Sequence, residues 1–404
     1  MTTLGRHISS DLKAQSERGE RVIHMLSWHE RTWRWVALVV LVAHGMLLVP
    51  SSPYGSAIEF REARAGYRFE FPRDHGTHDD FRTEWWYYTG QLKTEDGRRF
   101  GFELTFFRRA VDPGLVGANA SRWALHQLYL AHVALSDLDR QRFFYGEKIS
   151  RAGIGKAGAD SGRLHVWIDR WSADAPALPA GEHRLRAQTK EFGLELTLTS
   201  EKPPIIHGAH GVSRKGAAPG AGSHYYSLTR LATTGTVTVE GARHLVTGLG
   251  WMDHEFGSGD LGEDLVGWDW YSIQLASRTE IMIYNIRRAD GTVDAASSGT
   301  VILPDGHVLS LSAADVHVDV LGYWDSPVSR ARYPSGWRLR IPAADLSLTI
   351  LPLLAQQELV TNRSTRVTYW EGAVRVTGTD RNGPMEGQGY VELTGYAEPF
   401  RNGR

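Results

Sequence analysis

The sequence contains no cysteine, and this absence removes several classes of chemistry. The chain can form no disulfide, thiolate metal site, thiol nucleophile or lipid-modified cysteine. An excess of charge of one sign is also missing, because 45 Lys and Arg stand against 46 Asp and Glu in 404 residues. A nearly neutral chain gives no reason to expect nucleic acid as a partner. The G-x-S-x-G pattern of serine hydrolases does not occur either, so no such nucleophile supports a hydrolase.

Long apolar runs are scarce, and the one that stands out lies near the N-terminus. Residues 35–49 are apolar except for one histidine, but the run is shorter than the roughly 20 residues that a membrane span needs. Arg31 and Arg34 precede it, and Gly55 and Ala57 are small residues suited to cleavage. The pattern predicts an export signal cleaved near Ala57 and a body that faces the periplasm or the exterior. The alternative is an uncleaved anchor that keeps the protein on the membrane.

Beyond residue 66 the chain consists of short apolar or alternating segments separated by turn signals. Such segments are typical of β-strands, and Asp-Gly or Asn-Gly pairs between them are typical of hairpins. Convincing amphipathic helices are few. The pattern predicts an all-β fold, either a sandwich or a barrel. The expected strands lie at residues 100–107, 128–135, 163–168, 194–199, 236–241, 280–286, 337–342, 374–378 and 389–396, with turns at 95–97, 289–291, 304–306 and 381–383.

An internal repeat favours barrels. Trp85 matches Trp268 and Tyr88 matches Tyr271 when two aromatic segments are aligned. With a following hairpin that is shorter by four residues, the next strands and their Arg-Arg-Ala ends match as well. A repeat of about 180 residues has the size of a barrel domain, and an eight-stranded barrel leaves room for one small ligand. The aligned blocks are "TEWWYYTGQL" (83–92) with "GWDWYSIQL" (267–275), and "FELTFFRRA" (102–110) with "IMIYNIRRA" (281–289).

The sequence therefore predicts two tandem antiparallel barrels. We expect a polar lead and export signal at residues 1–57, a first barrel domain at 66–250 and a second at 251–404. If the aromatic strand of each copy closes its own barrel, its other face must meet the neighbouring domain or a cavity.

Five blocks in this order resemble the AttH/carotenoid 1,2-hydratase family, which includes hydroxyneurosporene synthases. The resemblance implies two lipocalin-like barrels and a lipophilic, isoprenoid-like ligand. For the hydratases it also implies a hydro-lyase activity that adds water to a C=C bond without a cofactor. Because this fold hosts binders and enzymes alike, a non-catalytic periplasmic carrier, or an accessory of an envelope transport system, is the alternative. The blocks are "FPRDHGTHDDFRTEWWYYTGQL" (71–92), "FGFELTFFRRA" (100–110), "PPIIHGAHGVSRKG" (203–216), "SHYYSLTRL" (223–231) and "GLGWMDHEFGSG" (248–259) followed by "GWDWYSIQL" (267–275).

The block "GWMDHEFGSG" is the first candidate for chemistry. On a strand, Asp253 shares a face with Trp251, whereas His254 shares the other face with Phe256. The resemblance places the candidate active-site histidine of the hydratases here, although family members often have Trp in place of Phe256. From the residues alone, the block could instead be a polar strand end whose acids cap a turn and whose His254 donates a hydrogen bond to a backbone carbonyl.

Asp269 is the second candidate, because it occupies the position of Trp86 in the other copy of the repeat. An acid among the rings of "GWDWY" should be desolvated, which raises its pKa. Hydrating an unactivated alkene needs an acid that protonates carbon, and a carboxyl group that is neutral near pH 7 can supply this proton. His254 would then position and deprotonate the attacking water. The structural alternative is that Asp269 accepts a bond from a Trp N–H or pairs with an arginine.

The predicted site thus has Asp269, His254 and Asp253 as catalytic residues, surrounded by rings that bind the ligand and stabilise a cation. No metal or cofactor is expected. His75 and His78 lie in a Gly-containing loop, where spacing fixes no third ligand. The rings are Trp86, Tyr88, Trp251, Phe256, Trp268, Trp270 and Tyr271.

Overall fold

A computed structural model describes residues 60–111, 125–176, 181–218, 220–381 and 383–400. The apolar run at 35–49 and the expected cleavage position at Ala57 lie outside these ranges. Within the described residues, no helix is long and apolar enough to cross a membrane.

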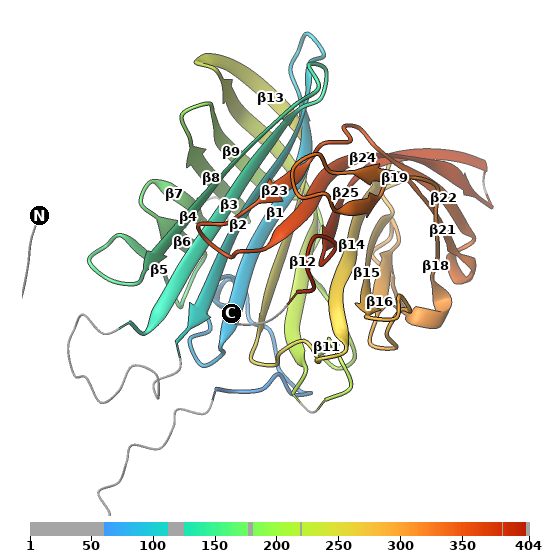
Figure 1. The fold of residues 1–404 in the computed structure, drawn as a ribbon, viewed down its shortest axis with the longest axis horizontal. Coiled ribbons are helices and arrows are strands. Elements are labelled where there is room, and N and C mark those ends of the chain that lie inside the picture. Colours follow the sequence, from blue (N-terminus) through green and yellow to red (C-terminus); the bar gives the residue numbers. More distant parts are fainter. Residues whose placement is uncertain (1–59, 112–124, 177–180, 219, 382, 401–404) are drawn as a thin grey trace, which may run out of the picture. The chain divides into compact units, whose positions relative to one another are not determined.

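The first part of the chain forms a 13-stranded antiparallel sheet that curves into a nearly closed barrel (Figure 1). Its strands follow the order β4-β3-β2-β1-β13-β12-β9-β8-β7-β6-β5, and β10 and β11 also pair with β12. β6 contacts β3 and β4, so the two ends of the sheet approach each other. The elements are η2 (Arg73–His75), β1 (Thr83–Lys93), β2 (Arg99–Ala110), β3 (Gln127–Asp137), β4 (Arg142–Arg151), β5 (Ala157–Ala159), β6 (His165–Ile168), β7 (Trp171–Asp174), β8 (Glu182–Gln188), β9 (Phe192–Ser200), β10 (Ile205–Ile206), β11 (Ser213–Arg214), β12 (Gly222–Val239) and β13 (Ala242–Gly257).

The second part forms a 10-stranded antiparallel sheet with the order β17-β16-β15-β14-β25-β24-β22-β21-β18, and β23 pairs with β24. Within the described residues β17 and β18 do not pair, so this sheet is a half-barrel. The all-β prediction with two antiparallel units is confirmed, but the second unit is open. The elements are β14 (Leu265–Leu275), β15 (Glu280–Arg288), β16 (Ser298–Ile302), β17 (Val308–Ser312), η3 (Ala313–Asp315), β18 (His317–Val320), β19 (Tyr323–Asp325), β20 (Arg332–Pro334), β21 (Trp337–Ile341), η4 (Pro342–Ala344), β22 (Leu346–Pro352), β23 (Glu358–Val360), β24 (Thr368–Asp380) and β25 (Gly383–Thr394).

The two sheets repeat the same strand order around the aromatic strands. β1 lies between β2 and β13, and β14 lies between β15 and β25. Trp85 pairs with Phe107, and its counterpart Trp268 pairs with Ile286, which is the residue that the alignment assigns to Phe107. The register therefore agrees with the expected hairpin that is shorter by four residues.

Two glutamines of the repeat tie the sheets together reciprocally. The Nε2 of Gln91 in β1 donates to the backbone carbonyl groups of Val374 and Gly389 in the second sheet, at 2.8 and 2.9 Å. The Nε2 of Gln274 in β14 donates to two backbone carbonyl groups of β12 and β13, both at 2.8 Å. Contacts of this kind are expected when two copies of one unit pack through equivalent surfaces.

The aromatic strands have two buried faces because each separates two hydrophobic layers. Trp86 and Tyr88 of β1 point into the core of the first barrel. Tyr87 points between the sheets, where it meets Trp270 of β14. Tyr271 points into the core of the half-barrel. The layer between the sheets, which we call the inter-sheet layer, thus receives side chains from both copies.

The first sheet ends later than the domain boundary expected at residue 250. β13 runs from Ala242 to Gly257, and the second sheet begins with Leu265. The block with Asp253 and His254 therefore belongs to the first sheet.

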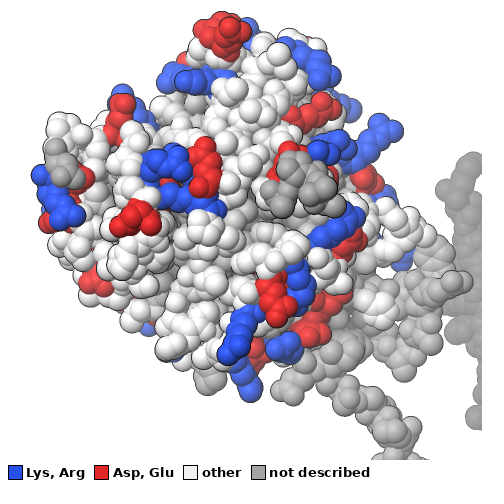
Figure 2. Space-filling model, turned by 180° about the vertical axis from the view of Figure 1, so that it is seen from behind, with Lys and Arg blue, Asp and Glu red and all other residues white. Residues whose placement is uncertain are grey.

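Acidic and basic side chains are interspersed on the surface. On the face shown in Figure 2, neither sign of charge dominates. Exposed ion pairs such as Arg142 with Glu240 are part of this mixture. Pairs of this kind contribute little to stability, because solvent screens the two charges.

Candidate functional site

Asp253 and His254 belong to two different clusters, because neighbours on a strand point to opposite faces. His254 lies in the core of the first barrel, and Asp253 lies in the inter-sheet layer. We call the first set the barrel cluster: Asp74, Thr77, His78, Glu84, Arg108, Tyr226 and His254. We call the second set the inter-sheet cluster: Asp253, Tyr225, Ser227, Trp251 and Trp270.

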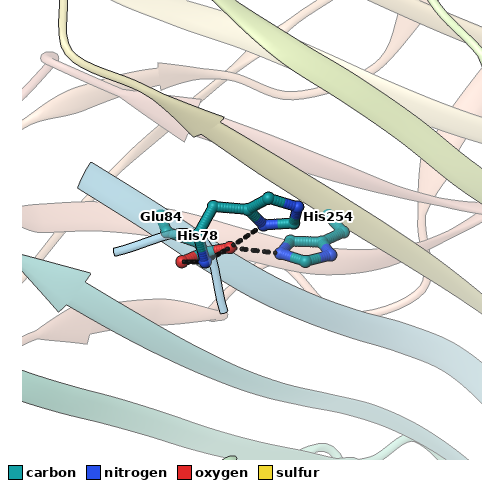
Figure 3. Close-up of side chains that lie close together, drawn as sticks. All are labelled: His78, Glu84 and His254. Carbon is teal, nitrogen blue, oxygen red and sulfur yellow. Dashed lines mark hydrogen bonds and ion pairs between the residues drawn. The ribbon is translucent and has the colours of Figure 1, made fainter. Parts of the chain in front are cut away.

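Glu84 is the centre of the barrel cluster (Figure 3). Its Oε1 atom accepts hydrogen bonds from His78 Nδ1 at 2.7 Å and from His254 Nε2 at 2.9 Å. Its Oε2 atom accepts from Arg108 Nε and from Thr77 Oγ1, both at 2.9 Å. The carboxylate thereby joins β1, β2 and β13 to the loop that follows η2.

The groups of the barrel cluster shift one another's pKa values. Burial alone would raise the pKa of Glu84, but the bonds from His254 and His78 and the charge of Arg108 hold it well below its usual value. Burial would lower the pKa of His78, yet its bonds to Asp74 and Glu84 raise it. At His254, burial lowers the pKa by more than the hydrogen bond and charge of Glu84 raise it, so the pKa of His254 is lowered. The cluster thus combines two carboxylates and one guanidinium with two histidines whose pKa values shift in opposite directions.

His78, Glu84 and His254 could hold a metal ion by distance, since their ligand atoms lie within 4.8 Å of one another. The chemistry of the set argues against it. Glu84 is saturated with donors, and a divalent cation would have to displace the proton between His78 and Glu84 beside Arg108. Desolvated like charges at such distances repel strongly. We assign no metal to the cluster.

Aromatic rings enclose the two histidines of the barrel cluster. Phe256 stacks on His78 with ring centroids 3.6 Å apart and planes tilted by 8°. Trp86 stacks on His254 with centroids 4.9 Å apart. Tyr226 lies at 3.1 Å from the remaining ring nitrogen of His254. His254 is fully buried, and its polar atoms are satisfied by the protein itself.

Asp253 is the acid of the inter-sheet cluster. It accepts hydrogen bonds from Tyr225 OH at 2.6 Å, from Trp251 Nε1 at 2.6 Å, and from Ser227 Oγ. Trp270 of the second sheet donates from Nε1 to Tyr225 OH at 3.1 Å. Trp251 and Trp270 meet edge to face, with centroids 6.2 Å apart. An acid from one sheet is therefore surrounded by rings from both.

The environment of Asp253 keeps it close to neutral. Burial raises the pKa of Asp253 to about 7, against the opposing effect of the bonds from Ser227, Tyr225 and Trp251. A carboxyl group in this state is an acid near neutral pH and becomes a base after it has lost its proton. The inter-sheet cluster can therefore donate a proton and take one back.

Asp269 lies apart from both clusters. It occurs on the face of β14 that carries Tyr271 and points into the half-barrel. Arg287 Nε donates to its Oδ1 at 2.9 Å, and Tyr396 OH donates to the same atom at 3.0 Å. Burial raises the pKa of Asp269, as expected from its aromatic neighbours, although Arg287 opposes the shift. The arginine pairing that the sequence left open as a structural alternative is present.

The repeat explains why Asp269 is an acid. Arg287 is the counterpart of Arg108, which pairs with Glu84 directly opposite on β1. In the second copy the position opposite the arginine is Gly267, where an added Cβ would lie 2.8 Å from the Arg287 guanidinium. The carboxyl group has moved two residues along the same face of the strand. Each copy thus supplies one acid to the arginine at this position, and the ion pair with Arg287 gives a structural reason for an acid at position 269.

The structure does not bring Asp269, His254 and Asp253 to one site, and the rings are divided in the same way. Strand alternation is the reason, because adjacent residues of β13 and β14 face different layers. Trp86, Tyr88 and Phe256 lie in the first barrel, Trp251 and Trp270 lie in the inter-sheet layer, Trp268 is half-buried at its edge against Phe400, and Tyr271 lies in the half-barrel.

Sequence reasoning missed Glu84, Arg108 and Tyr225. The sequence contains a signal for two of them. Glu84 is the acid directly before the four aromatic residues, and Arg108 begins the Arg-Arg-Ala end of the next strand. Their positions in the aligned hairpins would have indicated that they face each other. No sequence pattern around Tyr225 indicates its contact with Asp253, because this contact depends on the pairing of β12 with β13.

The comparisons with known proteins agree with this architecture. The sequence profile described as AttH-like matches residues 62–396. The crystal structure of a protein described as an AttH from Nitrosomonas europaea is 35% identical, with a TM-score of 0.75, and the match covers 83% of this chain and 99% of that one. Kievitone hydratase from Nectria haematococca has a TM-score of 0.65 at 14% identity, and the match covers 84% of this chain and 96% of that one. CghA has a TM-score of 0.52 at 17% identity, and the match covers 80% of this chain and 90% of that one. At these identities the last two show a shared fold. No sequence among the curated proteins matches significantly.

Proposed function

Because the chain belongs to the AttH-like family, we propose that it is a hydro-lyase that adds water to a C=C bond of a lipophilic, isoprenoid-like molecule by acid–base catalysis without a cofactor. The observation that carries the proposal is Asp253, a fully buried acid with a pKa of about 7 between Trp251, Trp270 and Tyr225. The fold is shared with a protein named as a hydratase, which supports the reaction class.

The reaction can be written with Asp253 alone as acid and base. The O–H bond of its carboxyl group breaks as a C–H bond forms at one alkene carbon, and the other carbon becomes cationic. The faces of Trp251 and Trp270 stabilise this cation. Water then forms the C–O bond, and its surplus proton returns to the Asp253 carboxylate. Proton donation and recovery at one group agree with a pKa near the working pH.

The hydrogen bonds to Asp253 would prepare it for this role. Tyr225, Ser227 and Trp251 fix the orientation of the carboxyl group and stabilise its ionised form after donation. Trp270 in turn fixes Tyr225. We further propose that the protein is exported, either released after the segment near Ala57 is cleaved or held on the membrane by it.

The proposal is tested with a matched pair of variants. Wild-type protein is incubated with neurosporene, lycopene and kievitone in H₂¹⁸O, and labelled alcohol is detected by mass spectrometry. Asp253→Asn keeps the shape but removes the transferable proton, so turnover should fall by at least about 100-fold. Asp269→Asn should keep turnover per folded molecule, because Asp269 pairs with Arg287 outside the inter-sheet layer.

Other outcomes separate the alternatives. Loss of turnover in folded Asp269→Asn protein, with Asp253→Asn active, would return the role of donor to Asp269. Tight binding of these molecules by wild-type protein without any labelled product would favour the carrier.

A further inference from the structure

Several buried oxygen atoms of the inter-sheet layer have no hydrogen-bond partner within the described residues; Tyr390 OH is one, and three others lie on residues that strand pairing and inter-sheet contacts connect. The three are Glu103 Oε2, Glu371 Oε2 and Thr89 Oγ1, and none forms a hydrogen bond within the described part of the chain. Their residues are 1%, 0% and 0% exposed. An unpaired buried polar group costs about 1–3 kcal/mol, and such groups in native proteins commonly mark a bound molecule or a catalytic role.

Strand pairing and two hydrogen bonds between the sheets connect these three residues. Thr89 of β1 lies directly opposite Glu103 of β2. Tyr87, two residues before Thr89 on the same face, donates from its OH to Glu371 Oε1 at 2.5 Å. Tyr369, two residues before Glu371 on β24, donates to Glu103 Oε1 at 3.2 Å. Each carboxyl group thus accepts a hydrogen bond at Oε1 from a phenol of the other sheet. Glu103 Oε1 also accepts one from Thr105 Oγ1 at 2.9 Å, and in both residues Oε2 has no partner within the described residues.

The backbone brings the two sheets into close contact here. A Cβ at Gly101 of β2 would lie 2.9 Å from the Cβ of Ala373 in β24. Gly101 lies two residues before Glu103, on the same face of the strand. This contact holds β2 and β24 near enough for Tyr369 to reach Glu103.

Both carboxyl groups are neutral at moderate pH. Burial raises the pKa of Glu103 to about 8, with a further contribution from Glu392. Burial also raises the pKa of Glu371 well above its usual value, and Glu103 and Glu392 add to the effect. A neutral carboxyl group offers both a donor and an acceptor, as does the hydroxyl group of Thr89. The chemistry that fits this set is an uncharged oxygen that donates and accepts, rather than a cation.

The three residues lie in the same layer as Asp253. The Tyr87 ring meets Trp270 edge to face at 5.1 Å, and Trp270 bonds Tyr225, which bonds Asp253. The charge of Asp253 also acts on Glu371. Tyr87, which holds Glu371, also lies directly opposite Asp253 in the pairing of β1 with β13, so the acid and the unpartnered oxygens flank the same tyrosine.

We propose that Glu103, Glu371 and Thr89 form a subsite for a single oxygen atom, which belongs to the attacking water before the reaction and to the hydroxyl group of the alcohol after it. The identity of that oxygen rests on the proposed function. The subsite adds what the Asp253 cluster lacks, a group that holds the nucleophile on a defined side of the cation.

The test compares two probes of nearly the same shape, 2-methyl-2-octanol and 2,2-dimethyloctane. Their affinities are measured by calorimetry for wild type, Glu371→Leu and Thr89→Val. Wild type should bind the alcohol at least about tenfold more tightly, a ratio worth 1.4 kcal/mol, and both substitutions should reduce this ratio several-fold. Glu358→Gln is the control and should keep it, because both oxygens of Glu358 are bonded by neighbouring side chains outside the subsite.

A crystal structure of the ligand-free protein gives the second measurement. An ordered water within about 3.2 Å of both free carboxyl oxygens is expected. If Glu371→Leu fails to fold, Thr89→Val still tests the subsite. This substitution removes a hydroxyl group that has no hydrogen-bond partner within the described residues, so we expect it to fold. An unchanged probe ratio in Thr89→Val, or a wild-type crystal with no ordered oxygen between the two carboxyl groups, overturns the assignment. Neither measurement depends on turnover. The subsite can therefore be confirmed even if Asp253→Asn stays active, and it can be refuted even if Asp253→Asn is inactive.

Discussion

Glu103 should make the protein less stable as the pH rises through neutrality. Its pKa of about 8 in the folded protein lies above its ordinary value of 4.5. The folded state therefore binds the proton more tightly than the unfolded state, and this contribution is fully present below about pH 4.5 and is lost as the pH approaches 8. At 1.36 kcal/mol for each unit of pKa difference, the loss between pH 6 and pH 8 is about 2 kcal/mol.

The substitution Glu103→Gln isolates this contribution, because glutamine keeps the shape and does not titrate. Free energies of unfolding are measured by urea denaturation of both proteins at pH 6 and pH 8. The decrease from pH 6 to pH 8 should be smaller by about 2 kcal/mol in Glu103→Gln than in wild type. Glu195→Gln is the control, since its side chain is 65% exposed and lies on β9 at the surface. Parallel curves for wild type and Glu103→Gln would show that Glu103 is ionised in the folded protein and would refute the reasoning.

Two further predictions concern the barrel cluster and the N-terminus. Glu84→Gln leaves Arg108 and His78 without their buried counter-charge, so the free energy of unfolding should fall by about 3–5 kcal/mol in urea titrations; a loss below 1 kcal/mol would contradict the charge assignment. N-terminal sequencing of envelope fractions should find a mature chain that starts near Ile58, whereas a membrane-bound product that retains residues 35–49 would favour the anchor.

The fold was predictable because its signals are local and repeated. Alternation in β2 and in β25 identifies strands without knowledge of their partners. The match of Trp85 with Trp268 predicted equivalent positions in two sheets, and the registers agree. The openness of the second sheet could not be predicted in this way. It depends on whether the terminal strands β17 and β18 meet, which is a property of the whole sheet.

The candidate site was harder to predict, because the chemistry of a residue depends on the layer that it faces. Strand alternation correctly separated Asp253 from His254, but it does not say which layer is the core of a barrel and which lies between two sheets. Asp269 was expected to be desolvated, and it is, but its partner Arg287 comes from a neighbouring strand. The hydrogen bonds of Glu103 with Tyr369 and of Glu371 with Tyr87 form only through the contact of the two sheets, which leaves no trace in either segment alone.

The distribution of these groups indicates why both copies of the repeat are needed. Each copy pairs one arginine with one acid, Arg108 with Glu84 in the first barrel and Arg287 with Asp269 in the half-barrel. Asp253, Glu103 and Glu371, whose pKa values are also raised by burial, lie instead in the inter-sheet layer. Asp253 belongs to the first sheet and Glu371 to the second. Neither sheet alone would desolvate Asp253 between two tryptophans or hold Glu371 against Tyr87, since one partner of each contact comes from the other copy. The duplication therefore creates, at the contact between the copies, an environment for buried acids that neither copy could provide in its own core.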